Sequence, residues 1–292
     1  MRALIVAVQA LAYALAIAQP VLAQTGSAQK IVSLDYCADQ YVLQFVEPAR
    51  ILALSPDSKK PFSYLRDQAQ DIPQIRPLTE DVLLAQPDLV VRSYGGGPNA
   101  LGFFERSGLR VLQVGYANDL ASIKRVTLEM ADGLGVPEAG RALVADIDHR
   151  LAAIAATRDT RTASESVLYM TTGGATSGPE TLVHDMLVAA GLRNFQTQAG
   201  WRSLPLEQLA YKQPDRVALA QFNQATPNTE SWSAVRHPLA QQQLWTRPTT
   251  VLEGAWTSCG AWFLLDAIEA LATGQAATGV SADPSAGPSG SK

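Results

Sequence analysis

Two segments nearly repeat each other: Pro77-Leu-Thr-Glu80-Asp-Val-Leu-Leu-Ala-Gln-Pro87-Asp88-Leu-Val-Val and Leu204-Pro-Leu-Glu207-Gln-Leu-Ala-Tyr-Lys-Gln-Pro214-Asp215-Arg-Val-Ala. Each begins with a short amphipathic helix that carries a glutamate in its first turn, where the helix dipole favours a carboxylate. A Gln-Pro-Asp break follows, because proline cannot continue a helix, and the next apolar run predicts a buried strand. In the two units the glutamate, the break and the apolar run stand at corresponding positions. Such a near-repeat predicts two similar lobes, each presenting a glutamate at an equivalent corner.

Short apolar runs alternate with helical patterns on both sides of these segments. Such alternation predicts an α/β fold with parallel sheets whose faces are covered by helices. Between the two sets, residues 119–156 show helical patterns only, and Pro137 begins a long stretch with apolar residues at helical spacing. The predicted strands lie at 30–34, 50–54, 88–92, 109–114, 166–170, 216–220 and 249–252.

The chain divides into five predicted parts: a signal peptide (1–23), an N-terminal lobe (24–118), a helical connector (119–160), a C-terminal lobe (161–272) and a disordered tail (273–292). The first part has one positive charge, an apolar stretch and a small-residue cleavage site, as secretory signals do. No cysteine stands at the cleavage site, so we expect an exported, soluble protein without a lipid anchor. The tail is rich in Gly, Ala, Ser and Pro and is predicted to be disordered.

Charge and motif content exclude several classes of function. The formal net charge of −4 argues against nucleic acid and against anionic membranes as partners. His149, His184 and His237 have no second ligand at metal-binding spacing, so no metal site and no resident cofactor is predicted. The sequence has no phosphate-binding glycine loop and no Ser–His–Asp order with a nucleophile elbow, and nothing in it indicates an enzyme.

Several pieces of the chain, taken in order and spacing, resemble the periplasmic substrate-binding proteins of ABC importers for iron–siderophore complexes, haem and cobalamin. The resemblance covers about residues 30–271 and implies two Rossmann-like lobes joined by a long connector helix, with a ligand cleft between the lobes. The pieces are Ile31-Val-Ser-Leu34, Leu83-Leu-Ala-Gln-Pro-Asp-Leu-Val-Val91, Gly108-Leu-Arg-Val-Leu112, Leu134-Gly-Val-Pro-Glu138, Ser177-Gly-Pro-Glu-Thr-Leu182, Ala190-Gly-Leu-Arg-Asn194 and Leu204-Pro-Leu-Glu-Gln-Leu209.

Glu80 and Glu207 have two interpretations. Each can serve only to stabilise its helix, because a carboxylate in the first turn contributes a few tenths to about 1 kcal/mol. The resemblance implies instead that the two glutamates dock onto arginines of the membrane permease, one from each lobe. Matching positions in the two near-repeats favour docking, since helix capping alone would not require glutamate in both.

Loops at the carboxyl ends of the predicted strands hold the candidate ligand-binding residues, because ligands of open α/β sheets bind beyond those ends. These loops are rich in aromatic residues, which suit bulky or planar metal chelates, although the same rings can serve to pack the lobes. Arg92, Arg202 and Lys59 are candidates to pair with an anionic ligand. The full set is Asp35, Tyr36, Cys37, Ser55, Lys59, Arg92, Tyr94, Tyr116, Thr172, Trp201, Arg202, Phe222, Trp256, Cys259 and Trp262.

Cys37 and Cys259 are the only two cysteines. In an oxidising compartment such a pair most often forms a disulfide, which here would join the two lobes across the cleft. The other interpretation is a pair of thiols that line the cleft and contact a metal centre carried by the ligand. The sequence leaves both open.

The resemblance implies a monomeric periplasmic binding protein that captures a metal chelate and delivers it to an ABC permease with its ATPase. A ferric siderophore is the first expectation for the ligand and cobalamin the second. An exported α/β enzyme, or a sensor unrelated to transport, is the alternative.

Overall fold

The computed structural model describes residues 30–157, 165–222 and 233–274. The predicted signal peptide and nearly all of the predicted tail lie outside these residues. Within the described part of the chain, no helix is both long enough and apolar enough to span a membrane.

The first lobe is built on a parallel sheet with the strand order β2-β1-β3-β4. Its strands agree with the predicted ones to within one or two residues at each end, because short β-branched runs bounded by polar turns are a strong signal. The strands are β1 (Ile31–Ser33), β2 (Ile51–Ala53), β3 (Leu89–Arg92) and β4 (Arg110–Gln113). The helices are α2 (Tyr36–Phe45), η1 (Pro48–Arg50), α3 (Thr79–Ala85) and α4 (Ala100–Arg106).

The second lobe repeats this plan with the parallel order β10-β9-β5-β7 and adds an antiparallel pair, β6 with β8. The added pair and the short β7 were not predicted, because two- and three-residue strands leave no periodicity to read. The strands are β5 (Ser166–Thr171), β6 (Ala175–Ser177), β7 (Arg193–Asn194), β8 (Trp201–Ser203), β9 (Arg216–Gln221) and β10 (Thr249–Glu253). The helices are α7 (Leu182–Ala189), α8 (Leu206–Tyr211), η3 (Ala234–Arg236), α9 (Pro238–Thr246), α10 (Gly254–Thr257) and α11 (Leu264–Thr273).

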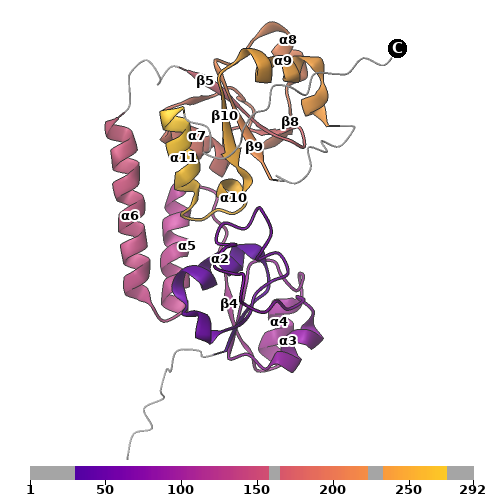
Figure 1. Cartoon of the computed structure of the whole chain (residues 1–292), viewed down its shortest axis with the longest axis vertical. Coiled ribbons are helices and arrows are strands. Elements are labelled where there is room, and N and C mark those ends of the chain that lie inside the picture. Colours follow the sequence, from indigo (N-terminus) through magenta and orange to yellow (C-terminus); the bar gives the residue numbers. More distant parts are fainter. Residues whose placement is uncertain (1–29, 158–164, 223–232, 275–292) are drawn as a thin grey trace, which may run out of the picture.

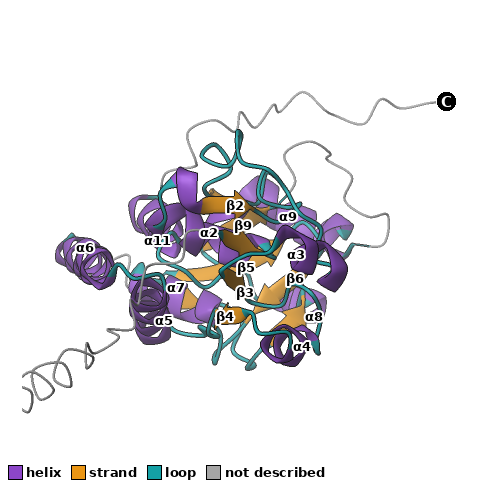
Figure 2. Cartoon of the chain, turned by 90° about the horizontal axis from the view of Figure 1, so that it is seen from below, coloured by secondary structure: helices purple, strands orange, loops and turns teal. Residues whose placement is uncertain are grey.

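Two helices stand between the two sheets in the chain order, α5 (Leu120–Gly133) and α6 (Pro137–Ala156). α6 runs along the long axis of the molecule beside α5 and α11 (Figure 1), and seen end-on it lies outside the rest of the fold (Figure 2). It is a single unbroken helix, as predicted, because no Gly or Pro interrupts residues 141–156. The two-lobed α/β fold is thus confirmed.

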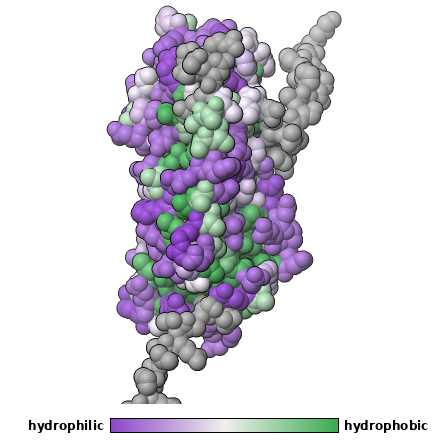
Figure 3. Space-filling model, turned by 90° about the vertical axis from the view of Figure 1, so that its left-hand side faces the viewer, coloured by the Kyte–Doolittle hydropathy of each residue, from purple (hydrophilic) through white to green (hydrophobic). Residues whose placement is uncertain are grey.

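The outer face of α6 is formed partly by exposed alanines, at 142, 145, 152, 153 and 155. Figure 3, which looks at this side of the molecule, accordingly shows hydrophobic residues interspersed among hydrophilic ones. Arg150 of α6 contacts α11: its guanidinium donates to Asp266 Oδ1 at 2.6 Å and to Glu269 Oε1 at 2.7 Å. This ion pair fastens the long helix to the second lobe.

The two lobes share one continuous hydrophobic core. Residues of α2 and α5 in the first half of the chain and of α7 and α11 in the second half belong to the same buried cluster. The ring of Tyr41 meets that of Trp262 edge-on, with centroids 5.3 Å apart. Removing apolar surface from water drives this packing, so the lobes are held together by the same force that forms each of them.

Polar contacts add to the shared core. Tyr64, on the loop after β2, stacks on Phe263 and donates its hydroxyl to Asp266 Oδ2 at 2.6 Å. Arg66, on the same loop, forms an ion pair with Glu253 at 2.9 Å. The loop is held in shape by the buried Gln40, which accepts from the Leu65 N–H. These contacts link the loop after β2, called the β2 loop below, to the second lobe.

Candidate functional site

Two adjoining pockets, of about 550 and 410 Å³, lie between the lobes. The loop after β4 forms one side of both, and the link between α10 and α11 forms the other. Gly260 is required in that link, because a Cβ there would stand 2.7 Å from the Ala117 carbonyl oxygen. The residues common to both pockets are Tyr116, Ala117, Ser258, Cys259 and Gly260.

Cys37 and Cys259 form a disulfide, with Cα atoms 5.8 Å apart, and both residues line the larger pocket. Both sulfurs are bonded to each other, so the alternative of two free thiols facing a metal centre does not describe this structure. The disulfide joins the start of α2 to the α10–α11 link. It is therefore a covalent connection between the lobes beside the pockets.

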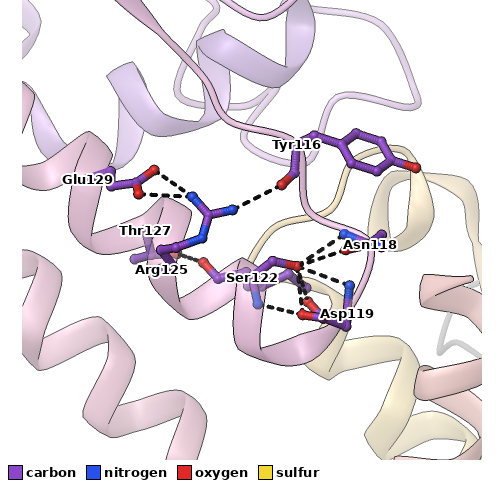
Figure 4. Close-up of polar contacts among 8 residues, drawn as sticks. Tyr116, Asn118, Asp119, Ser122, Arg125, Thr127 and Glu129 are labelled. Carbon is purple, nitrogen blue, oxygen red and sulfur yellow. Dashed lines mark hydrogen bonds and ion pairs between the residues drawn. The ribbon is translucent and has the colours of Figure 1, made fainter.

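Tyr116 is held by its backbone and leaves its ring free (Figure 4). Its carbonyl oxygen accepts from Arg125, which also pairs with Glu129 on the same helix. Asp119 caps α5 by accepting from the Ser122 N–H, and hydrogen bonds from Ser122 lower the pKa of the Asp119 carboxyl. The Tyr116 ring, 83% exposed, points away from this network. A rigid loop thus presents an aromatic surface to the pockets.

Trp201, in the second lobe, lines the smaller pocket together with Tyr116. Its indole is 56% exposed and rests edge-on against the buried Tyr169. The neighbouring Arg202 does not join it: its side chain donates to the Ala199 carbonyl and lines a separate pocket near α8. Successive residues of a strand point to opposite faces, which explains why the side chains of Trp201 and Arg202 line different pockets.

Tyr36, Phe62 and Tyr94 form an aromatic group on the first lobe. The Tyr36 ring lies edge-on to Phe62 and Tyr94, with centroids 5.0 and 6.0 Å away. The Tyr36 hydroxyl donates to the Ser258 carbonyl across the interlobe boundary. Burial is the main cause that raises the pKa of both tyrosines. Phe62 was not among the predicted residues, although its place in the loop after β2 could have indicated it.

Asp35 and Arg92 lie inside the fold rather than on the pocket surface, at 2% and 5% exposure. Asp35 caps α2, and its other oxygen accepts from the backbone N–H groups of Ser93, Tyr94 and Gly95. Arg92 donates to the carbonyls of Gly95 and Gly97. These two predicted ligand contacts instead shape the loop after β3, because buried charges require partners and the loop supplies them.

Ser55 is likewise buried, and its hydroxyl donates to Asp39 Oδ2 at 2.5 Å. Burial is the main cause that raises the pKa of the Asp39 carboxyl to about 6, and the hydrogen bonds from Ser55 oppose it. Lys59 donates to the Gln70 carbonyl within the β2 loop. None of these side chains is directed by its contacts toward the two pockets.

We expect Asp39→Asn to flatten the dependence of stability on pH between about 4 and 6. The folded carboxyl binds its proton more tightly than the unfolded one, so the wild-type free energy of unfolding falls as pH rises through this interval. The fall is on the order of 3 kcal/mol, since one pKa unit corresponds to about 1.36 kcal/mol. Urea denaturation at several pH values measures it, and an equally steep fall in the variant would contradict the assignment.

Four predicted residues of the second lobe also serve packing or backbone contacts. Trp262 is 6% exposed and packs on Tyr41 and Phe45 in the core, so the structure corrects its placement on the pocket wall. Phe222 and Trp256 are partly buried and pack against the same core. The carbonyl of Thr172 accepts from the Ser233 hydroxyl.

Glu80 and Glu207 are both exposed, in the first turns of α3 and α8. Their helices lie on the side of the molecule opposite to α6, one in each lobe (Figures 1 and 2). The N-cap residues of the two helices, Leu78 and Pro205, make no side-chain cap hydrogen bond. Two exposed carboxylates on one side of the molecule are available to a single partner that spans both lobes.

The pockets carry little charge. Of the described residues that line them, only Glu180 is charged, and none is Lys or Arg. Among residues 30–157, 165–222 and 233–274, no group of three His, Cys, Asp or Glu side chains is arranged to hold a metal ion. Exposed rings, backbone carbonyls and small polar side chains therefore dominate the site.

The periplasmic binding protein family matches residues 31–254, which form most of the chain. The chain belongs to this family. Members of the family bind solutes, so the pockets between the lobes are where a ligand is expected. Among curated proteins, no sequence matches the chain at a significant level.

Solved structures of other periplasmic binding proteins share the fold. A haem-binding protein from Pseudomonas aeruginosa is 24% identical, with a TM-score of 0.66 over 84% of this chain and 92% of that one. A possible iron-binding protein from Staphylococcus epidermidis is 16% identical, with a TM-score of 0.67 over 85% and 98%. A vitamin B12-binding protein of Vibrio cholerae is 20% identical, with a TM-score of 0.62 over 85% and 96%.

Proposed function

We propose that this periplasmic binding protein captures a metal chelate between its lobes and delivers it to an ABC permease with its ATPase. The observation that carries the proposal is the pair of exposed rings, Tyr116 and Trp201, that line one interlobe pocket from opposite lobes. Aromatic side chains bury large areas of a planar or bulky ligand and lose little conformational entropy in doing so. The names of the structural relatives, which bind haem, iron or vitamin B12, support the same class of ligand.

The lining of the pockets narrows the class of chelate. A tris-catecholate siderophore is highly anionic and would require Lys or Arg, which the described pocket lining lacks. The three cations predicted to pair with an anionic ligand are occupied by backbone carbonyls. Neutral or cationic chelates, namely hydroxamate siderophores first and cobalamin second, fit this lining better. Export to the periplasm follows from the proposed role.

A panel of chelates tests the proposal. Wild-type protein is mixed with ferrioxamine B, ferrichrome, cyanocobalamin, haemin or ferric enterobactin, and thermal stability and tryptophan fluorescence are recorded. We expect at least one neutral or cationic chelate to stabilise the fold, by about 2.7 kcal/mol at a hundred times its dissociation constant. If no member of the panel stabilises the protein, the proposal is wrong.

Paired variants locate the binding. Tyr116→Ala and Trp201→Ala should each weaken the bound chelate about tenfold or more, because truncating an aromatic anchor in a binding site costs well over 1 kcal/mol. Tyr211→Ala and Trp245→Ala are matched controls, since these rings are 94% and 80% exposed on α8 and α9 and line neither pocket. Equal loss in the controls would show that binding occurs elsewhere.

A further inference from the structure

Glu180 stands at the smaller interlobe pocket without a partner. Its side chain is exposed, and no hydrogen bond or ion pair to another described residue engages it. The backbone places it beside Trp201: Gly178 N donates to Gly200 O at 3.0 Å, and Gly200 N donates to Pro179 O at 2.9 Å. Tyr116 lines the same pocket from the other lobe. The pocket therefore combines one carboxylate with two exposed aromatic rings.

The backbone of Glu180 is in the left-handed region, with φ of 65°. Pro179 followed by a residue of positive φ is the pattern of a type II turn. The second of the two central residues of such a turn is normally Gly. A side chain at such a position costs stability, and residues held this way concentrate at functional sites. Gln86, at the end of α3, is the other non-glycine residue with positive φ in the described ranges, and it lies in neither pocket.

We propose that Glu180 binds a positively charged nitrogen group of the ligand, while the rings of Tyr116 and Trp201 flank that group. A carboxylate forms its strongest hydrogen bonds with charged N–H donors. Aromatic faces attract the same cations through their quadrupoles. The inference rests on the proposed function and adds that the chelate bears an ammonium or guanidinium group. Glu180 is the only charged residue in the described lining of the two pockets.

A matched pair of ligands tests the charge preference. Ferrioxamine B carries an ammonium group at one end, and its N-acetyl derivative has the same iron centre without that charge. We expect wild-type protein to bind the ammonium form about tenfold more tightly, which corresponds to about 1.4 kcal/mol. In Glu180→Gln, which keeps the shape but not the charge, this preference should fall several-fold, and only the attraction of the two rings for the cation should remain. Equal binding of both forms by wild-type protein, or a preference of undiminished size in Glu180→Gln, overturns the inference.

Backbone strain supplies a second, independent readout. Glu180→Gly and Gln86→Gly both relieve a positive-φ side chain, so both should raise the melting temperature by roughly 1 to 3 °C. Only Glu180→Gly should weaken the binding of ferrioxamine B, by about tenfold. If Glu180→Gly is more stable than wild-type protein but binds the ligand more weakly, the Glu180 side chain is retained for ligand binding at a cost in stability. Unchanged affinity in Glu180→Gly overturns the inference, whatever its melting temperature.

Failure of the inference can be told apart from failure of the proposed function. If wild-type protein binds a chelate of the panel and loses that binding in Trp201→Ala, but binds ferrioxamine B and its N-acetyl derivative equally, the metal-chelate function stands and the role of Glu180 falls. If no chelate of the panel binds to wild-type protein, both fall together.

Discussion

Replacing both cysteines with serine should lower the free energy of unfolding by about 5 kcal/mol. The disulfide closes a loop whose ends are 222 residues apart, and in the chain-entropy model a loop of that length restricts the unfolded chain by about this amount. Guanidinium denaturation of wild-type protein and of Cys37→Ser/Cys259→Ser, at one pH and ionic strength, measures the difference. Affinity for the ligand should fall as well, because the pockets would no longer be held in one geometry by a covalent connection.

Reduction is the natural control for that experiment. Wild-type protein treated with a reductant should unfold at the same guanidinium concentration as the double variant, and the reductant should leave the double variant unchanged. Either single serine variant should behave like the double one. Coincident unfolding curves for oxidised and reduced wild-type protein would contradict the expected contribution of the disulfide.

Replacing Glu80 and Glu207 together with alanine should abolish uptake of the chelate by cells while leaving its affinity for the purified protein unchanged. Both carboxylates are exposed in short helices far from the pockets, so the substitutions remove charge from the surface without touching the ligand. Charge pairs at the rim of an interface act mainly on orientation and association rate, and loss of both should prevent productive docking. Uptake of a labelled chelate and equilibrium binding are the two measurements.

Single variants and a charge control sharpen the result. Each single alanine variant should reduce uptake partially, because one lobe still docks. Glu105→Ala, which removes an exposed carboxylate from α4, should leave uptake at the wild-type level. Normal uptake by the double variant would show that neither glutamate takes part in docking.

Local patterns in the sequence were sufficient for most of the secondary structure. Apolar runs such as 88–92 and 216–220 predicted β3 and β9 because each run is short and follows a proline that ends a helix. The stripe after Pro137 predicted the whole of α6 because apolar side chains recur at helical spacing without a breaker. The last helix, α11, ends at Thr273, one residue beyond the predicted end of the C-terminal lobe, since helix termini leave the weakest signal.

The candidate site was harder to predict, because burial depends on contacts between residues far apart in the sequence. The rule that ligands lie beyond the carboxyl ends of strands selected Tyr116 and Trp201 as candidates, and both line a pocket in the structure. The same rule could not separate them from Arg92, whose partners are carbonyls of its own loop, or from Trp262, which packs on Tyr41 from the other lobe. Glu180 was not among the predicted site residues, because the positive φ that draws attention to it is a backbone angle that the sequence does not display.

The shared core also sets the order in which the chain can fold. Tyr41 and Tyr64 of the first lobe obtain their aromatic partners Trp262 and Phe263 only when the segment that leads into the last helix is present. A first lobe emerging from a ribosome or a translocation channel therefore lacks one side of its interior until nearly the whole chain has followed. Contacts over such sequence separations form slowly, because a long loop must close first. We expect the polypeptide to stay open during export and to fold as one unit after its C-terminal helix arrives.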